Sequence, residues 1–203
     1  MRLNKVTITV SIAATLLLGT TGHAAETYTI DPAHTRVGFA VRHFGINTVK
    51  GRFNEFTGKL TLDGDTLKEA TATIQVQSID TGVKQRDDHL RSPDFFDAKS
   101  HPTITFTSKR VEKSGDQIIL VGDFTMRGVT KELRLPLTLS KPLKDPSGAI
   151  RVGLETKTTI NRRDYGISYG GLLESGVAAV GDEVEIEINA EAVKDKPAGE
   201  QSK

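Results

Sequence analysis

The chain contains no cysteine and no tryptophan among its 203 residues. Without cysteine it has no disulfide, no thiolate metal site and no thiol nucleophile, so its stability must come from packing. The same absence excludes the lipid-modified cysteine of a lipoprotein. The lack of tryptophan, together with frequent threonine, alanine and glycine, leaves fewer bulky side chains to fill the interior of the fold.

Neither sign of charge is in excess. The chain has 27 Lys and Arg against 26 Asp and Glu, and loss of Arg2 and Lys5 with the N-terminal segment would leave 25 against 26, a net charge of about −1. A chain this balanced has no basic field to collect nucleic acid or an anionic membrane surface. We therefore expect no nucleic-acid partner.

The N-terminus lacks an apolar run long enough to span a membrane, which takes about 20 residues. A basic start, Met1–Lys5, precedes the uncharged stretch Val6–Gly19, and the small residues of Gly22–Ala24 follow it. This order predicts a secretory signal peptide over residues 1–24. We expect an exported, soluble protein that resides in the periplasm of a Gram-negative cell; a retained interfacial anchor is the alternative.

The rest of the chain has the size of one domain, which we place at residues 25–194. Residues 195–203 are dominated by Lys, Glu, Pro and Gly and contain no large apolar side chain. They predict a disordered C-terminal tail.

Motifs for metal binding and catalysis are also missing. No His-x-His or His-Glu-x-x-His spacing occurs among His34, His43, His89 and His101. We therefore expect no metal site. The chain has no Gly-x-Ser-x-Gly elbow, and its Gly166 and Gly170 do not open a helix after a strand, so a serine hydrolase and a phosphate loop are both unsupported.

What the chain does have is alternation of apolar and polar residues with a period of two, which is typical of strands with one apolar face. Clear examples are the series Leu133, Leu135, Leu137, Leu139 and the series Val184, Ile186, Ile188, Ala190. Strands with one solvated face and one apolar face are typical of antiparallel sheets. Phe53 and Phe56 are out of phase with each other, which predicts a bulge or bend near Asn54.

Turn signals such as Asp63-Gly64-Asp65 separate about eight such strands. Only residues 82–96 break the pattern, and they predict one short helix near residues 82–92. Long antiparallel strands with one apolar face either pair as a sandwich or close into a barrel, and closure leaves no unpaired edge. The fold class we predict is all-β, an extended eight-stranded antiparallel barrel, with the sandwich as the alternative.

Several motifs occur in order along the chain. They include Asp31-Pro-Ala-His34-Thr35, Phe39-Ala-Val-Arg-His43, Gly51-Arg-Phe53, His89-Leu-Arg-Ser-Pro-Asp-Phe-Phe96, His101-Pro-Thr-Ile-Thr-Phe106, Gly122-Asp-Phe-Thr-Met-Arg-Gly-Val-Thr-Lys131 and Arg163-Asp-Tyr-Gly-Ile167. With these motifs the chain from about Tyr28 to Val193 resembles the YceI family of bacterial periplasmic proteins. It departs from the family pattern at Thr35, where serine is common, and at the doubled Arg162-Arg163.

The resemblance implies a lipocalin-like barrel that holds a polyisoprenoid or a similar long-chain amphiphile, such as an isoprenoid quinone, a prenyl phosphate or a fatty amide. The family shows no established catalytic residues, which implies non-enzymatic binding, storage or transport. No cofactor is required, although the bound molecule can itself be an isoprenoid quinone or a polyprenyl lipid. We further expect transient membrane contact and a homodimer, with residues 170–180 as a mobile flap.

Inward-facing apolar residues are the candidates for the ligand tunnel. They are Phe39, Val41, Phe53, Phe56, Ile74, Val76, Ile104, Phe106, Phe124, Met126, Leu133 and Leu135, with Phe95 and Phe96 at the mouth. Each buried methylene of a lipid tail gains roughly 0.8 kcal/mol. The alternative is a filled core, in which the same side chains only pack on one another.

The polar candidates for the lipid head group are His43, Arg86, His89, Arg91, Asp164 and Tyr165. A guanidinium can bind a diphosphate or polarise a quinone carbonyl. The structural alternative is that the segment from His89 to Asp94 pins the predicted helix to the barrel and that His43 is a hydrogen-bonded core residue.

Two other functions stay open at this point. An enzyme acting on a similar lipid would need a compact set of titratable groups, for example His43 beside Asp164 or Tyr165. A stress-linked interaction protein would have a filled barrel and would work through its outer face.

Overall fold

The structure is a computed structural model that describes residues 25–114 and 117–196. The predicted signal peptide, residues 1–24, and residues 197–203 of the predicted tail lie outside the described residues. Asp195, at the start of that tail, donates its backbone N–H to the carbonyl oxygen of Thr27 at 2.8 Å. Over the two described ranges, no helix combines the length and the apolar character needed to cross a bilayer.

The secondary structure is mostly β. The strands are β1 (Glu26–Ile30), β2 (Arg36–His43), β3 (Asn47–Phe53), β4 (Phe56–Asp63), β5 (Thr66–Gln75), β6 (Ile79–Asp80), β7 (Thr103–Ser114), β8 (Gln117–Met126), β9 (Val129–Leu139), β10 (Leu143–Lys144), β11 (Ile150–Asn161) and β12 (Val180–Lys194). The helix α1 is Lys84–Arg91, and the 3-10 turns are η1 (Pro32–His34), η2 (Val76–Ser78) and η3 (Arg162–Tyr165).

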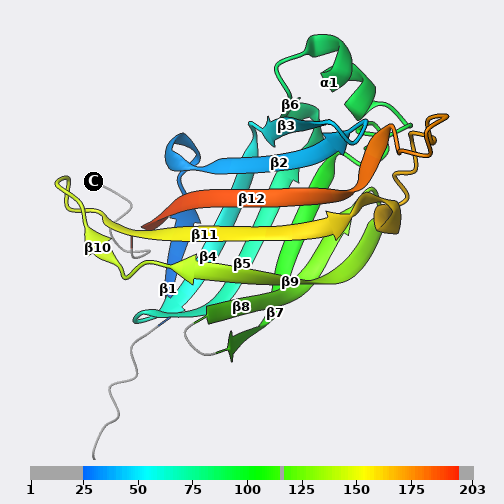
Figure 1. The fold of residues 1–203 in the computed structure, drawn as a ribbon. Helices are drawn as coiled ribbons and strands as arrows, with labels where there is room; N and C mark the ends of the chain where they lie inside the picture. Colours follow the sequence, from blue (N-terminus) through cyan, green and yellow to red (C-terminus); the bar gives the residue numbers. More distant parts are fainter. Residues whose placement is uncertain (1–24, 115–116, 197–203) are drawn as a thin grey trace, which may run out of the picture.

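These strands close into an antiparallel ring of eight strand positions (Figure 1). Three of the positions are bent, because β1 continues into β2 across η1, β3 into β4, and β5 into β6 across η2. From β11 the ring runs through β9, β8, β7, β5, β4 and β1 to β12, which pairs back to β11. The predicted eight-stranded antiparallel barrel is confirmed, and β10 is an additional short strand on β11.

The predicted bend near Asn54 is present where β3 passes into β4. The Asn54 backbone N–H donates to the carbonyl oxygen of Ser78 at 3.2 Å, and its side-chain amide donates to Asp80 at 3.3 Å. On either side of the bend, Phe53 pairs with Ile79 and Phe56 with Ile74. The two neighbouring strand positions, β3–β4 and β5–β6, therefore bend at the same level of the barrel.

The two ends of the barrel differ in how they are filled. One end of the barrel is the end at which the described chain begins and ends (Figure 1). Its lumen is filled by side chains that are no more than 2% exposed, namely those of Tyr28, Leu62, Leu67 and Val152. We call this the packed end. Helix α1 lies over the opposite end. The filled-core alternative thus describes one end of the barrel.

Helix α1 has the position predicted for it and is held to the barrel by polar contacts. The Asp87 carboxylate, 7% exposed, accepts hydrogen bonds from the backbone N–H and the hydroxyl of Thr81. Arg91 donates to the carbonyl oxygens of Gln77 and Ile79 at 2.9 and 2.7 Å. These contacts place the inner face of α1, including Leu90, over the lumen.

Candidate functional site

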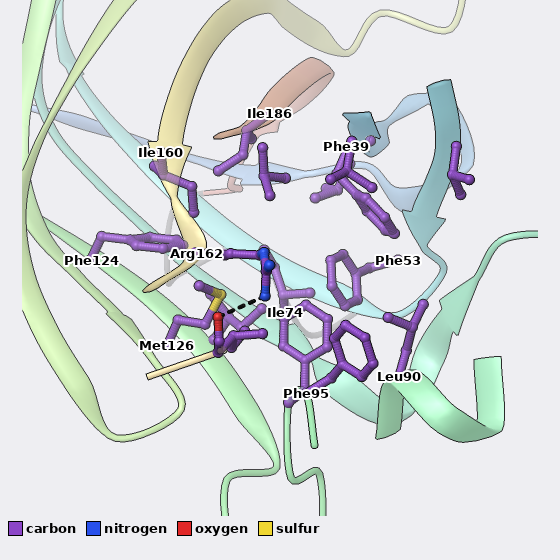
Figure 2. A pocket seen from close by; sticks show the side chains of 18 of the residues that line it. Phe39, Phe53, Ile74, Leu90, Phe95, Phe124, Met126, Ile160, Arg162 and Ile186 are labelled. Carbon is purple, nitrogen blue, oxygen red and sulfur yellow. Dashed lines mark hydrogen bonds between the residues drawn. The ribbon is translucent and has the colours of Figure 1, made fainter. Parts of the chain in front are cut away.

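Under α1 the lumen is hollow and forms a cavity of about 380 Å³. One wall is built by β2, β3 and β12, and the other by β5, β7, β8 and β9. Figure 2 shows aromatic and aliphatic side chains from both walls, with Leu90 of α1 and Phe95 beside them, pointing into this space. The exposed Arg42 and Tyr169 also line it, so the cavity reaches the surface at the α1 end.

Most of the apolar side chains predicted to form the tunnel line this cavity. They are Phe39, Val41, Phe53, Ile74, Phe95, Phe96, Ile104, Phe106, Phe124, Met126, Leu133 and Leu135. The period-two pattern accounts for those on strands, because every second residue of a barrel strand faces the lumen. Phe95 and Phe96 instead lie in the loop after α1.

Phe56 and Val76, which we also expected in the tunnel, lie outside the lining. Val76 opens the turn η2, donates its N–H to the carbonyl oxygen of Pro102 at 2.9 Å, and is 1% exposed inside the core. Phe56 begins β4 beyond the bend and borders a shallow groove with Pro32 and Thr57. Both residues flank the shared bend of the two strands, where a simple alternation no longer predicts the facing.

The sequence reasoning missed part of the lining. The residues not predicted include Val37, Val49, Ala72, Leu90, Ile160, Ile167, Tyr169, Val180, Val184, Ile186 and Ile188. Val184, Ile186 and Ile188 carried a usable signal, because they alternate along β12 as clearly as the predicted residues do. Ile167, Tyr169 and Val180 come from a loop and a strand end, where no periodicity applies.

Among the polar candidates, His43, Arg86 and His89 line the cavity. Arg86 is engaged locally, since its Nε donates to the hydroxyl of Thr81 at 2.8 Å. The Nε2 atom of His89 lies 2.9 Å from a carboxylate oxygen of Asp94. The His89 ring packs edge-on against Phe95 and Tyr169, with ring centroids 5.1 and 4.7 Å apart. This aromatic cluster stands where the cavity reaches the surface.

Arg91, Asp164 and Tyr165, the other polar candidates, do not line the cavity. Arg91 anchors α1 as described, and Asp164 forms an exposed ion pair with Lys131 at 3.2 Å. The Tyr165 ring is 3% exposed and packs edge-on against Phe124 at 5.5 Å, and this burial raises its pKa. The structure therefore does not assemble His43 with Asp164 or Tyr165.

The one buried charged residue among the described residues that line the cavity was not predicted. The Arg162 side chain is 4% exposed, and Figure 2 shows it projecting into the space between Met126 and Ile74. Burial lowers the pKa of this guanidinium, and the nearby Asp182 acts in the opposite direction. The sequence signal was the doubled arginine, but nothing in it told which of the two turns inward.

A family model described as the YceI-like domain matches residues 28–192. The chain belongs to this family. Protein YceI of Salmonella arizonae is 36% identical over 185 residues, which cover 89% of this chain and 94% of the relative.

Two solved structures share the YceI-like fold of this chain. The YCEI protein of Campylobacter jejuni superposes with a TM-score of 0.66 at 30% identity, over 82% of this chain and 96% of that one. A polyisoprenoid binding domain from Saccharophagus degradans superposes with a TM-score of 0.64 over 83% of this chain and 98% of that one. Its identity is 16%, so this second likeness shows the fold alone.

Several of the YceI motifs meet at the α1 end of the barrel. Arg127, in the β8–β9 turn, donates through Nη1 to the carbonyl oxygen of Gly166 and through Nη2 to that of Pro93 at 2.8 Å. Gly128, which follows with φ +75°, faces the His101 ring, and an added Cβ would approach that ring to 2.8 Å. These motif residues thus join the loops around the cavity mouth, which is a structural role.

Exposed apolar side chains of the YceI-like barrel gather beside that mouth. Phe44, Ile46, Leu172, Leu173 and Val177 are 40%, 82%, 75%, 40% and 39% exposed, and we call them the apolar rim. Their two loops are joined, because the backbone N–H of Phe44 donates to the carbonyl oxygen of Ala179 at 3.0 Å.

One group in the described part of the chain has the composition of a metal site, namely Asp31, His34 and Glu191. Arg151 already lies there, with Nη1 2.8 Å from Asp31 and 3.3 Å from Glu191. Hydrogen bonds from Arg151 and then from His34 lower the pKa of Asp31 to about 2. The group is an ion-pair cluster whose positive charge comes from the arginine.

Proposed function

We propose that this YceI-like protein binds the tail of a polyisoprenoid or a similar long-chain amphiphile in the cavity under α1 and carries it without chemical change. The observation that supports this most strongly is the cavity itself, about 380 Å³ of space with an almost wholly apolar lining and access to the surface. Small-molecule sites typically measure about 300–1,000 Å³. A polyisoprenoid binding domain of the same fold gives independent support.

The energetics favour an apolar tail over a polar ligand. Each methylene moved out of water gains roughly 0.8 kcal/mol. A tail of a dozen carbons thus gains on the order of 10 kcal/mol, part of which offsets the entropy lost on binding. The aromatic and aliphatic walls offer few groups that would repay the desolvation of a sugar or a nucleotide.

We further propose that the protein works in the periplasm and docks on a lipid bilayer to load its ligand. The leader-like segment at residues 1–24 supports the compartment. The apolar rim supports docking, because Ile46 and Leu172 are exposed on the two loops that adjoin His43 and Val180 of the cavity lining. A tail that leaves a bilayer there crosses little water before it enters the cavity.

An enzyme acting on the same lipid is less well supported. The titratable groups that would form its active site are separated, since His43 lines the cavity whereas Asp164 pairs with Lys131 outside it. No described observation favours a reaction over simple binding.

Native mass spectrometry of the full chain purified from the periplasm of a Gram-negative host tests the proposal, together with extraction of the bound lipid. We expect an adduct of a long-chain amphiphile, and saturable uptake of a fluorescent polyisoprenoid after delipidation. Recovery of ligand-free protein only, with no uptake by the delipidated chain, would overturn the proposal. A protein found only in the cytoplasmic fraction would contradict the compartment.

A further inference from the structure

Arg162 is a charged side chain built into an apolar cavity. In the described part of the chain, the buried polar side chains are those of Asp87, Thr156 and Arg162, and Arg162 is the one that lines the cavity. Placing a cation in such surroundings costs several kcal/mol unless hydrogen bonds and charge compensate for the lost water.

Four of the five N–H groups of a guanidinium find protein acceptors here. Nε donates to the carbonyl oxygen of Gly181 at 2.9 Å and Nη1 to that of Ile167 at 2.9 Å. Nη2 donates to the carbonyl oxygen of Val180 at 3.1 Å and to Asp182 at 3.0 Å. The second N–H of Nη1 has no acceptor among the described residues, and the side chain that carries it points into the cavity (Figure 2).

Charge compensation at this position is also incomplete. Asp182 is the carboxylate that faces Arg162, and the same Asp182 oxygen lies 2.7 Å from Nε of Arg163. One negative charge thus serves two guanidinium groups, so this side of the cavity keeps a positive potential. A ligand atom with partial negative charge is favoured next to Nη1, and a cationic head group is disfavoured.

We propose that Arg162 is the head-group site, in which its free Nη1 N–H donates to a neutral carbonyl oxygen of the bound lipid, such as that of a quinone or an amide. This inference rests on the proposed function, because it names the chemistry of the ligand held in the same cavity. A single available N–H fits one uncharged acceptor. A phosphate or diphosphate normally takes paired donors and would bring further charge into an apolar space.

Other cations near the cavity are less suited to this role. Arg86 is only half-buried and donates through Nε and Nη2 to Thr81, at 2.8 and 3.0 Å, so that water can satisfy its remaining N–H groups. Arg42 is exposed and donates to Thr48 and to the carbonyl oxygen of Gly45. Arg162 is the buried one.

Competition for the delipidated full chain tests the inference, with a fluorescent polyisoprenoid as the displaced probe. Decylbenzene and 2-decyl-1,4-benzoquinone share a tail and a six-membered ring but differ in the two carbonyl oxygens, and decyl phosphate supplies the anion. We expect the quinone to bind at least about tenfold more tightly than decylbenzene, since hydrogen bonds to charged groups are worth this much or more. We also expect the carbonyl stretch of the bound quinone to shift to lower frequency.

The doubled arginine offers a matched pair of variants. Arg162→Met should bring the quinone-to-decylbenzene ratio close to one, whereas Arg163→Met, which removes the exposed partner of the same Asp182, should keep it. Arg162→Lys retains the charge and should lower the ratio several-fold; it serves in place of Arg162→Met if that variant does not fold.

The outcomes separate the two proposals. Equal binding of quinone and decylbenzene to the wild-type protein, or a ratio unchanged in a folded Arg162 variant, overturns the head-group site and leaves tail binding intact. Tighter binding of decyl phosphate than of the quinone overturns it in favour of an anion site. Failure of all three compounds and of the fluorescent probe to bind overturns the proposed function itself.

Discussion

Leu133 shows how one residue position decides whether a barrel strand fills the lumen or leaves it open. It is partly buried and lines the cavity from β9, while Leu137, two inward positions further along the same strand, is 4% exposed in the packed region. The same residue type thus borders empty space in one place and dense core in another. The difference comes from what stands across the lumen.

Leu133→Trp should therefore block ligand uptake. The indole ring fills part of the cavity, so we expect uptake of a fluorescent polyisoprenoid to fall at least about tenfold. The free energy of unfolding should change by less than the 1–3 kcal/mol typical of overpacking in a dense core, because space is available. Titration with the probe and urea unfolding measure the two effects.

Thr138→Trp is the control, since Thr138 is exposed on the outer face of the same strand. It should take up the probe as the wild type does. Normal uptake by a folded Leu133→Trp variant would contradict binding in this cavity.

Asp31 determines part of the acid stability of the fold. Its pKa is lowered from 3.8 to about 2 in the folded protein, so its ion pair with Arg151 stabilises the fold fully above about pH 4 and loses that effect as the pH falls toward 2. Asp31→Asn should be less stable than the wild type at neutral pH, and the two proteins should converge in acid. Thermal melting between pH 2 and pH 7 measures this, and a difference that does not depend on pH would contradict it.

At the scale of elements, α1 shows how a short helix can be fixed by its polar residues. Asp87 is buried against Thr81, whereas its neighbour Asp88 is exposed and pairs with Lys84 at 2.5 Å and with Arg91 at 3.1 Å, both on the helix itself. Two adjacent carboxylates on one helix thus have different surroundings. They allow the attachment of α1 to be tested separately from its helical propensity.

Asp87→Ala should destabilise the protein by about 1–3 kcal/mol, because it leaves buried donors of Thr81 without an acceptor. It should also raise hydrogen exchange across residues 84–91, since α1 loses its tie to the barrel. Asp88→Ala should leave the free energy of unfolding close to that of the wild type, as expected for exposed ion pairs. Urea unfolding and amide exchange measure both, and equal effects of the two substitutions would contradict the anchoring role of Asp87.

The two loops of the apolar rim are the second element with a distinct role. Phe44 adopts φ +51°, a region that non-glycine residues seldom occupy. Its ring packs on that of His43, with the two ring centroids 3.8 Å apart. Such a conformation persists only when the surroundings enforce it. The turn therefore holds an aromatic ring in solvent next to a residue of the cavity lining.

Ile46→Ser combined with Leu172→Ser should slow transfer of a polyisoprenoid from vesicles at least several-fold, with affinity for the dispersed ligand unchanged. Leu143→Ser is the matched control, because Leu143 is 56% exposed on β10, away from α1 (Figure 1). Vesicle co-sedimentation and the transfer rate are the measurements. Unchanged transfer would contradict membrane docking, and loss of a dimer in sedimentation would assign the rim to a second copy of the chain.

At the scale of the whole molecule, the two ends of the barrel have different roles. The packed end stabilises the fold, and the hollow end has space for a ligand. Filling the hollow end with a ligand adds contacts that the empty protein lacks. By linkage, a ligand present at 100 times its Kd stabilises the folded state by roughly 2.7 kcal/mol.

The reloaded protein should therefore melt several degrees above the delipidated protein. Differential scanning calorimetry of the two forms measures this, and Leu133→Trp should show little difference between them. Identical melting of the loaded and empty wild type would contradict a guest in the cavity.

The sequence favoured a barrel but left a sandwich open. By itself it determined the antiparallel strands, the helix under which the cavity lies, the bend near Asn54 and most of the inward apolar residues. All of these follow from local rules, because side chains alternate at every residue and turns need particular residue types. The sequence could not determine the facing of Phe56 and Val76, since a bend shared by two strands interrupts the alternation.

Only the tertiary structure decided where the lumen is empty, that Arg162 rather than Arg163 is buried, and that Asp164 and Tyr165 stand apart from His43. A cavity is the difference between the volume that eight strand positions enclose and the volume that their side chains fill. That difference depends on residues far apart in the chain that meet only after closure. For the same reason, a buried charge is recognised only once its partners from β12 and from the loop after η3 are in place.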